Sequence, residues 1–245
     1  MVKRKRSLTS QNICGRLESR CAGMAWDRRP LLTRGVQGRF LFVGERLCLD
    51  FVNTRGVVHS QLVDLLQGFP DWVEWSLEAK VLNSSQARQA LRHWKGSRQT
   101  AGAFDLAKAF RESLRLAVEQ AVRRDRIPES SISEINALLR HPIGYSVLAY
   151  GQDQLEMQRR LVFDEPIHLL VPVAESAADL VSHGDWSLIK KCENPACVLY
   201  FYDTTKNHAR RWCSMSLCGN RMKVAAFYRR RRNTKAEQMI PDVSQ

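Results

Sequence analysis

Residues 192–221 read CENPACVLYFYDTTKNHARRWCSMSLCGNR and contain four of the seven cysteines of the 245-residue chain. Their spacing is C-x4-C-x15-C-x4-C, formed by Cys192, Cys197, Cys213 and Cys218. Thiolate sulfur is a preferred ligand of zinc, and four thiolates complete the tetrahedral shell of a structural site. Both pairs lie in turn-forming sequence, and a hairpin across the 15 intervening residues would bring them together. The spacing therefore predicts one structural zinc ion bound by these four cysteines.

The remaining three cysteines, Cys14, Cys21 and Cys48, are scattered toward the N-terminus. The N-terminal residues are basic, and no apolar segment follows them. We therefore expect no secretory signal and a reducing, cytoplasmic location. In such a compartment clustered cysteines indicate metal or redox chemistry rather than disulfides. A thiol-based redox sensor is the alternative to zinc binding.

The net charge of +13 is unevenly distributed along the chain. Residues 1–40 contain ten Lys and Arg against two acidic residues, and residues 190–235 contain twelve against two. Residues 41–189 contain 16 against 19, so this part is close to neutral. An excess of positive charge at both ends favours a polyanionic partner. Nucleic acid is the partner that this pattern predicts.

The segment after Cys218, GNRMKVAAFYRRRRNTK, predicts a basic helix whose apolar residues 224–228 pack on the zinc core. Arginine clusters of this kind neutralise phosphates. Asn and Arg at a rigid helix start also suit bidentate contact with base edges, with helix capping and turn bracing as the alternative. The predicted nucleic-acid contacts are Lys206, His208, Arg210, Arg211, Asn220, Arg221, Lys223, Arg229, Arg230, Arg231 and Arg232.

Upstream of the cysteines, the pattern predicts a mostly helical body. FLFVG and LCLDFVNT, separated by Gly44 and Glu45, suggest a β-hairpin. A second hairpin is expected from residues 145–150 and 155–163. Apolar residues at spacings of three and four predict helices near 71–82, 84–94, 103–124, 131–140 and 172–182. We expect Leu77 and Val81 to be buried in the first of these, and a Ser131-x-x-Glu134 capping box to start the fourth.

Two polar residues, Asp50 and Asn53, interrupt the apolar LCLDFVNT segment. Capping or turn hydrogen bonds explain them better than a catalytic carboxylate does. The body contains no Walker-type loop, no nucleophile elbow and no H-E-x-x-H motif. We therefore predict no catalytic residues and no enzymatic activity.

Residues 192–232, with FYDTT, ARRWCSM and Cys218-Gly219-Asn220-Arg221, closely resemble the CGNR-type zinc finger. LCLDFVNT, at residues 47–54, resembles the opening strand of the ABATE domain, which usually precedes that finger. The resemblance implies a stress-related bacterial transcription regulator whose finger binds zinc through the four cysteines and contacts DNA.

The predicted fold class is α+β, with a mostly helical N-terminal domain, short β-hairpins and a small zinc-binding module that ends in a basic helix. The predicted boundaries are 1–37 for a disordered basic extension, 38–185 for an ABATE-like sensing domain, 186–234 for a separate finger and 235–245 for a tail. Duplex DNA is the expected partner, and the N-terminal domain is expected to sense a small molecule or a protein. An RNA-binding or ribosome-associated zinc protein is the alternative.

Overall fold

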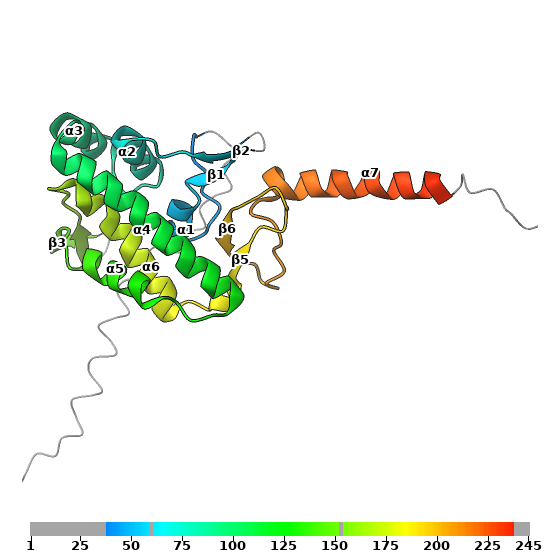
Figure 1. Ribbon diagram of the computed structural model, residues 1–245. Helices are drawn as coiled ribbons and strands as arrows, with labels where there is room; N and C mark the ends of the chain where they lie inside the picture. The colour runs from blue at the N-terminus through cyan, green and yellow to red at the C-terminus, as the bar shows by residue number, and fades with distance from the viewer. Residues whose placement is uncertain (1–37, 59–60, 152–153, 238–245) are drawn as a thin grey trace, which may run out of the picture. The chain divides into compact units, whose positions relative to one another are not determined.

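The computed structural model describes residues 38–58, 61–151 and 154–237 (Figure 1). The predicted extension 1–37 and most of the predicted tail lie outside the described residues. Within the described residues the fold is α+β, as predicted: a mostly helical body, three two-stranded antiparallel ribbons and a C-terminal four-cysteine module. None of the helices described in this chain is long and apolar enough to span a lipid bilayer.

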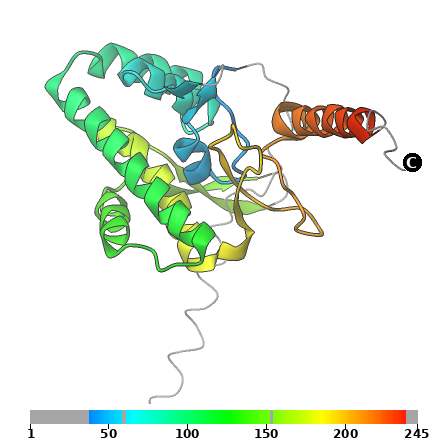
Figure 2. The ribbon, with the colours of Figure 1, turned by 45° about the vertical axis from the view of Figure 1, so that its right-hand side comes forward.

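The helical body is built around α4 (Arg98–Arg123), against which α1, α2, α5 and η2 pack (Figure 2). Its buried face follows the predicted spacing of three and four residues, from Phe104 through Phe110 and Leu114 to Ala121. The other helical elements of the body are α1 (Leu47–Val52), α2 (Phe69–Glu78), α3 (Ser84–Trp94), α5 (Glu129–Leu139), η2 (Pro166–Leu170) and α6 (Val171–His183).

Aromatic side chains fill the centre of this body. Trp72 and Trp75 of α2 are fully buried, and the ring of Trp75 lies 5.1 Å from that of Phe51 in α1. Burying aromatic rings of this size provides a large share of the hydrophobic stabilisation of a small core. These tryptophans are therefore packing residues of the core, as their helical spacing indicates.

The predicted hairpin around Gly44 and Glu45 is wrong, because LCLDFV forms the short helix α1. Residues Cys48 to Val52 are all buried, and a short run that is buried on every side has no apolar periodicity to distinguish a strand from a helix. Glu45, at φ 62°, reverses the chain before α1. The buried Asp50 accepts a 2.7 Å hydrogen bond from the Gly44 amide, which confirms the predicted turn contact. Burial raises the pKa of Asp50 to about 8.

Two local predictions in the helices are also wrong. The Ser131–Glu134 capping box does not form, because α5 already begins at Glu129 after Pro128. Ser131 instead donates a hydrogen bond to the carbonyl of Ser113 in α4. In α2, Leu77 is exposed and Val81 lies beyond the end of the helix, only partly buried.

The first two ribbons belong to the helical body. β1 (Arg55–Val58) pairs with β2 (Gln61–Asp64), a ribbon that the sequence pattern did not indicate. β3 (Tyr145–Tyr150) pairs with β4 (Leu155–Arg160), close to the second predicted hairpin. Gly144, at φ 80°, enters β3 where a Cβ would collide with the carbonyl of Arg160. Only glycine fits this turn without strain.

The C-terminal module contains η3 (Trp186–Leu188), the ribbon of β5 (Ile189–Lys191) with β6 (Tyr200–Tyr202), the π-helical turn η4 (Met215–Gly219), and α7 (Asn220–Glu237). Ile189, Tyr200 and Tyr202 are buried in the same hydrophobic core as the helical body. In the other direction, Leu41 and Val43 from the start of the body pack against the cysteine cluster. The two parts therefore share packed residues, and the boundary at residues 185 and 186 stays a prediction.

Asn53 joins the two parts through backbone-like hydrogen bonds. Its Nδ2 donates to the carbonyl of Tyr200 at 2.8 Å, and its Oδ1 accepts from the amide of Tyr200 at 2.9 Å. Both groups are buried, so the side-chain amide replaces the neighbouring strand that β6 lacks on this side. A further hydrogen bond joins β6 to the helical body: the amide of Tyr202 donates to the Gly44 carbonyl at 2.9 Å.

We predict that Asn53→Ala lowers the free energy of unfolding by about 2–4 kcal/mol, because it leaves a buried N–H and a buried C=O of β6 without partners. Chemical denaturation followed by circular dichroism measures this change. Asn207→Ala, at an exposed position in the module, is the control and should change stability by less than about 0.5 kcal/mol. A loss below about 1 kcal/mol for Asn53→Ala would show that the contact does not hold the module.

Candidate metal centre

Two turns position the four cysteines. Cys192 and Cys197 lie in the turn between β5 and β6, and Cys213 and Cys218 lie before and within η4. We expected a hairpin in the 15 residues between Cys197 and Cys213. The structure instead has the β5–β6 ribbon, and the turn of this ribbon contains Cys192 and Cys197. The two turns are joined by a hydrogen bond from the Glu193 amide to the Arg211 carbonyl, 3.0 Å long.

The four sulfur atoms form a compact cluster that fits one zinc ion. All lie within 4.8 Å of one another, and the distances from Cys213 Sγ to Cys197 Sγ and Cys218 Sγ are 3.9 and 3.6 Å. Zinc–sulfur bonds of about 2.3 Å in a tetrahedron place neighbouring sulfurs about 3.8 Å apart. The four cysteine side chains are buried or nearly so, which suits a structural site without an open coordination position.

Interactions among the thiols also favour a bound cation. A hydrogen bond with Cys197 lowers the pKa of Cys192. Hydrogen bonds with Cys192 raise the pKa of Cys197 to about 12 and raise that of Cys213 even more strongly. Thiols this close cannot all ionise without a compensating charge. A divalent metal ion would supply that charge and hold all four as thiolates.

Asn194 supports the cluster from inside the first turn. It is buried, and its Nδ2 donates a hydrogen bond to Cys218 Sγ at 3.2 Å. Its Oδ1 accepts from the amide of Ala196, and its carbonyl accepts from the amide of Cys197. From the sequence we expected residues 193–196 only to form a turn, and we did not predict this contact. An amide side chain two residues after a ligand cysteine is the signal that could have indicated it.

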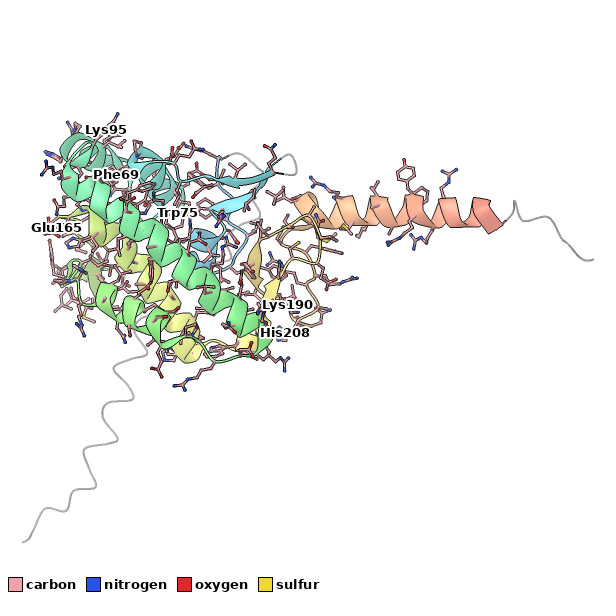
Figure 3. All side chains as sticks on the ribbon, viewed as in Figure 1. Phe69, Trp75, Lys95, Glu165, Lys190 and His208 are labelled. Atoms are coloured by element: carbon pink, nitrogen blue, oxygen red, sulfur yellow. The ribbon has the colours of Figure 1, made fainter. Side chains whose placement is uncertain are left out.

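Asp203 organises the loop between β6 and the second cysteine pair. This fully buried carboxylate accepts hydrogen bonds from Lys190 Nζ at 2.7 Å, from the amide and hydroxyl of Thr205 and from the amide of Arg210. Burial alone would raise its pKa, but the bonds from Lys190 and Thr205 outweigh burial and lower the pKa to about 2. Lys190 also donates to the His208 carbonyl, and Figure 3 shows these two residues side by side. The sequence reasoning missed Asp203 as well.

Arg210 was predicted to contact nucleic acid, but the structure uses its guanidinium inside the protein. Nη1 binds Glu45 at 2.9 Å, Nη2 donates to the Val43 and Cys213 carbonyls, and Nε donates to the Trp212 carbonyl. The guanidinium also lies 4.3 Å from the ring centroid of Phe201. Arg210 is therefore a clamp between the cysteine cluster and the helical body, and this correction removes it from the candidate nucleic-acid contacts.

Most of the other predicted contact residues lie on the surface. Lys206, His208, Asn220, Arg221, Lys223, Arg229, Arg230 and Arg231 are all exposed. Arg211 is exposed too, but its Nε is 2.6 Å from Glu193 Oε2. Arg232 lies in α7, and its side chain is outside the described residues.

The prediction that residues 224–228 form a helix is confirmed, but their predicted packing on the zinc core is wrong. Val224, Phe227 and Tyr228 are each about half exposed. The cysteine core is completed instead by Leu199 and Phe201, with Leu41 and Val43 from the helical body packed against it.

We predict that the full chain purified without chelator contains about one zinc ion per molecule, and that Cys213→Ser contains less than a tenth of that amount. Elemental analysis after gel filtration measures the ratio. The reason is that three thiolates cannot complete the closed tetrahedral shell that a structural site requires. Cys48→Ala removes a buried thiol outside the cluster and should keep the metal. Equal zinc in all three proteins would exclude the cluster as the binding site.

Two family models match consecutive parts of the chain. The CGNR zinc finger model matches residues 189–231, and the ABATE model, described as "Putative stress-induced transcription regulator", matches residues 45–184. No curated protein matches the chain. Since the ABATE match covers more than half of the sequence, the chain belongs to the ABATE family of transcription regulators and carries a CGNR zinc finger at its C-terminal end.

Proposed function

We propose that this transcription regulator binds duplex DNA through the zinc finger and α7, and that the helical domain senses a ligand or a partner protein. The proposal retains a functional division at residues 38–185 and 186–234, although the two parts share a core. The single observation that carries it is the excess of cations over acidic residues in the finger.

Internal ion pairs account for both acidic residues of the finger. Asp203 neutralises Lys190, and Glu193 neutralises Arg211. Residues 190–235 contain twelve cations and two acidic residues, so a net charge of +10 remains in this span. A field of one sign on an exposed surface attracts a polyanion and favours phosphate contacts.

Helix α7 suits contact with DNA because it has no apolar face toward the protein. Its described side chains are exposed or half-buried, and arginine and lysine occur around its whole circumference. Such a helix gains little from packing in the free protein, so a partner must supply its stabilisation. A helix has the diameter that the major groove admits, and the arginines of α7 would reach the flanking phosphates.

Asn220 and Arg221 are the best candidates for reading bases. They begin α7 just beyond Cys218, separated from it by Gly219, so zinc coordination by Cys218 would fix their backbone. Asn220 has helical φ and ψ of −64° and −41°, not the extended conformation of an N-cap, which argues against the capping alternative. Among the described residues neither side chain has a hydrogen-bonding partner. Asn and Arg are suited to bidentate contacts with adenine and guanine respectively.

We predict that DNA affinity falls with salt concentration with a log–log slope near −4.5, as expected for about five phosphate contacts. Arg229→Ala should reduce the magnitude of this slope by about 0.9 on every sequence. Arg221→Ala should instead cost about 1–3 kcal/mol on a selected preferred site and little on random duplexes. Fluorescence anisotropy titrations at several salt concentrations measure both effects.

Arg126→Ala provides the matched control, because it removes an exposed arginine of the helical domain and should leave the slope and the affinity unchanged. Competition with structured RNA belongs to the same experiment. Stronger binding to RNA than to any selected duplex would replace DNA with RNA as the partner. Equal weakening of preferred and random duplexes by Arg221→Ala would assign that residue to the phosphate backbone.

A further inference from the structure

The β3–β4 ribbon presents an apolar strip to solvent on one face. Register pairs Leu148 with Met157 and Tyr150 with Leu155, and directly opposed residues of antiparallel strands lie on the same face. These four residues are 74%, 75%, 88% and 55% exposed respectively. Large apolar side chains adjacent on one surface, rather than scattered singly, mark an interaction site.

The opposite face of the ribbon is more mixed in composition and burial. Val147, Ala149 and Gln158 on that face are half-buried, whereas Tyr145, Glu156 and Arg160 are exposed. The four adjacent large apolar side chains therefore lie on one face only. A two-stranded ribbon is marginally stable by itself, so covering the strip would also stabilise the element.

The size of the strip is sufficient for an interface between two copies. Four large side chains with these exposures present roughly 500 Å² of mainly apolar surface, and burying two such strips removes roughly 1,000 Å² from water. That area reaches the lower limit for a specific protein interface, about 1,000–1,200 Å². A weak dimer with a dissociation constant in the micromolar range is the expected result.

We propose that two copies of this chain associate through the β3–β4 strips, packed face to face about a two-fold axis. The strip contains no charged residue that would require a complementary charge on a different partner, so it can serve as its own partner in a symmetric contact. Tyrosine and methionine, both enriched in interfaces, provide half of it. Arg159, at the end of the same face, is bound to Glu175 and lies where an interface rim would be.

Sedimentation velocity of the full chain between about 1 and 100 μM tests the proposal without DNA, and so independently of the proposed function. The wild type should shift from monomer toward dimer across this range. Leu148→Thr/Met157→Thr keeps residues that favour strands but removes the apolar contact. This variant should weaken association at least 30-fold and remain monomeric. Leu116→Gln, which removes an exposed leucine of α4, should behave like the wild type.

Hydrogen exchange on the wild type provides a readout that does not depend on a variant folding. Amides of residues 145–160 should gain protection as the concentration rises through the association range. A wild type that stays monomeric at 100 μM would overturn the proposal and leave the strip to a different protein. Dimerisation that persists in the double variant, or protection that rises elsewhere instead, would also overturn it.

Discussion

The side-chain amide of Asn53 lies beside β6 where another strand would lie, and the rest of the structure depends on that placement. One buried residue of the helical body satisfies both backbone groups of Tyr200, the residue at which β6 begins. β6 in turn holds β5 in register, and the turn between them carries Cys192 and Cys197. The geometry of the cysteine cluster is thus continuous with the core of the ABATE domain.

Zinc and Arg210 complete this connection from the other side. A zinc ion held by the four cysteines would tie the two cysteine turns together, and Arg210 binds the second turn to Glu45 and to the Val43 carbonyl of the helical body. Tyr200 also reaches the body, where its hydroxyl donates to Glu119 of α4. Any change in the helical domain that moves α1 or α4 therefore moves the base of the finger. This coupling would give the proposed sensing domain a physical route to the proposed DNA-binding surface.

The sequence predicted the features that depend on local spacing. It did not predict the features that depend on contacts between residues distant in the sequence. The spacing of four cysteines identified the metal cluster, and the periodicity from Phe104 to Ala121 identified α4. The segment 47–52 was taken for a strand because a fully buried helix shows no alternation. Arg210 was taken for a surface cation because its partners Glu45 and Val43 are more than 160 residues away in sequence. The roles of Asn194 and Asp203 likewise require knowledge of what surrounds them.

We expect the finger and the helical domain to form one cooperative structure, with zinc as a shared support. Hydrogen–deuterium exchange of the full chain before and after zinc removal by a chelator tests this coupling. Residues 189–219 should lose protection together with α1 and with residues 111–121 of α4, because Asn53, Arg115 and Glu119 lose their partner Tyr200 in β6. Loss of protection confined to residues 189–237, with α1 and α4 unchanged, would contradict it.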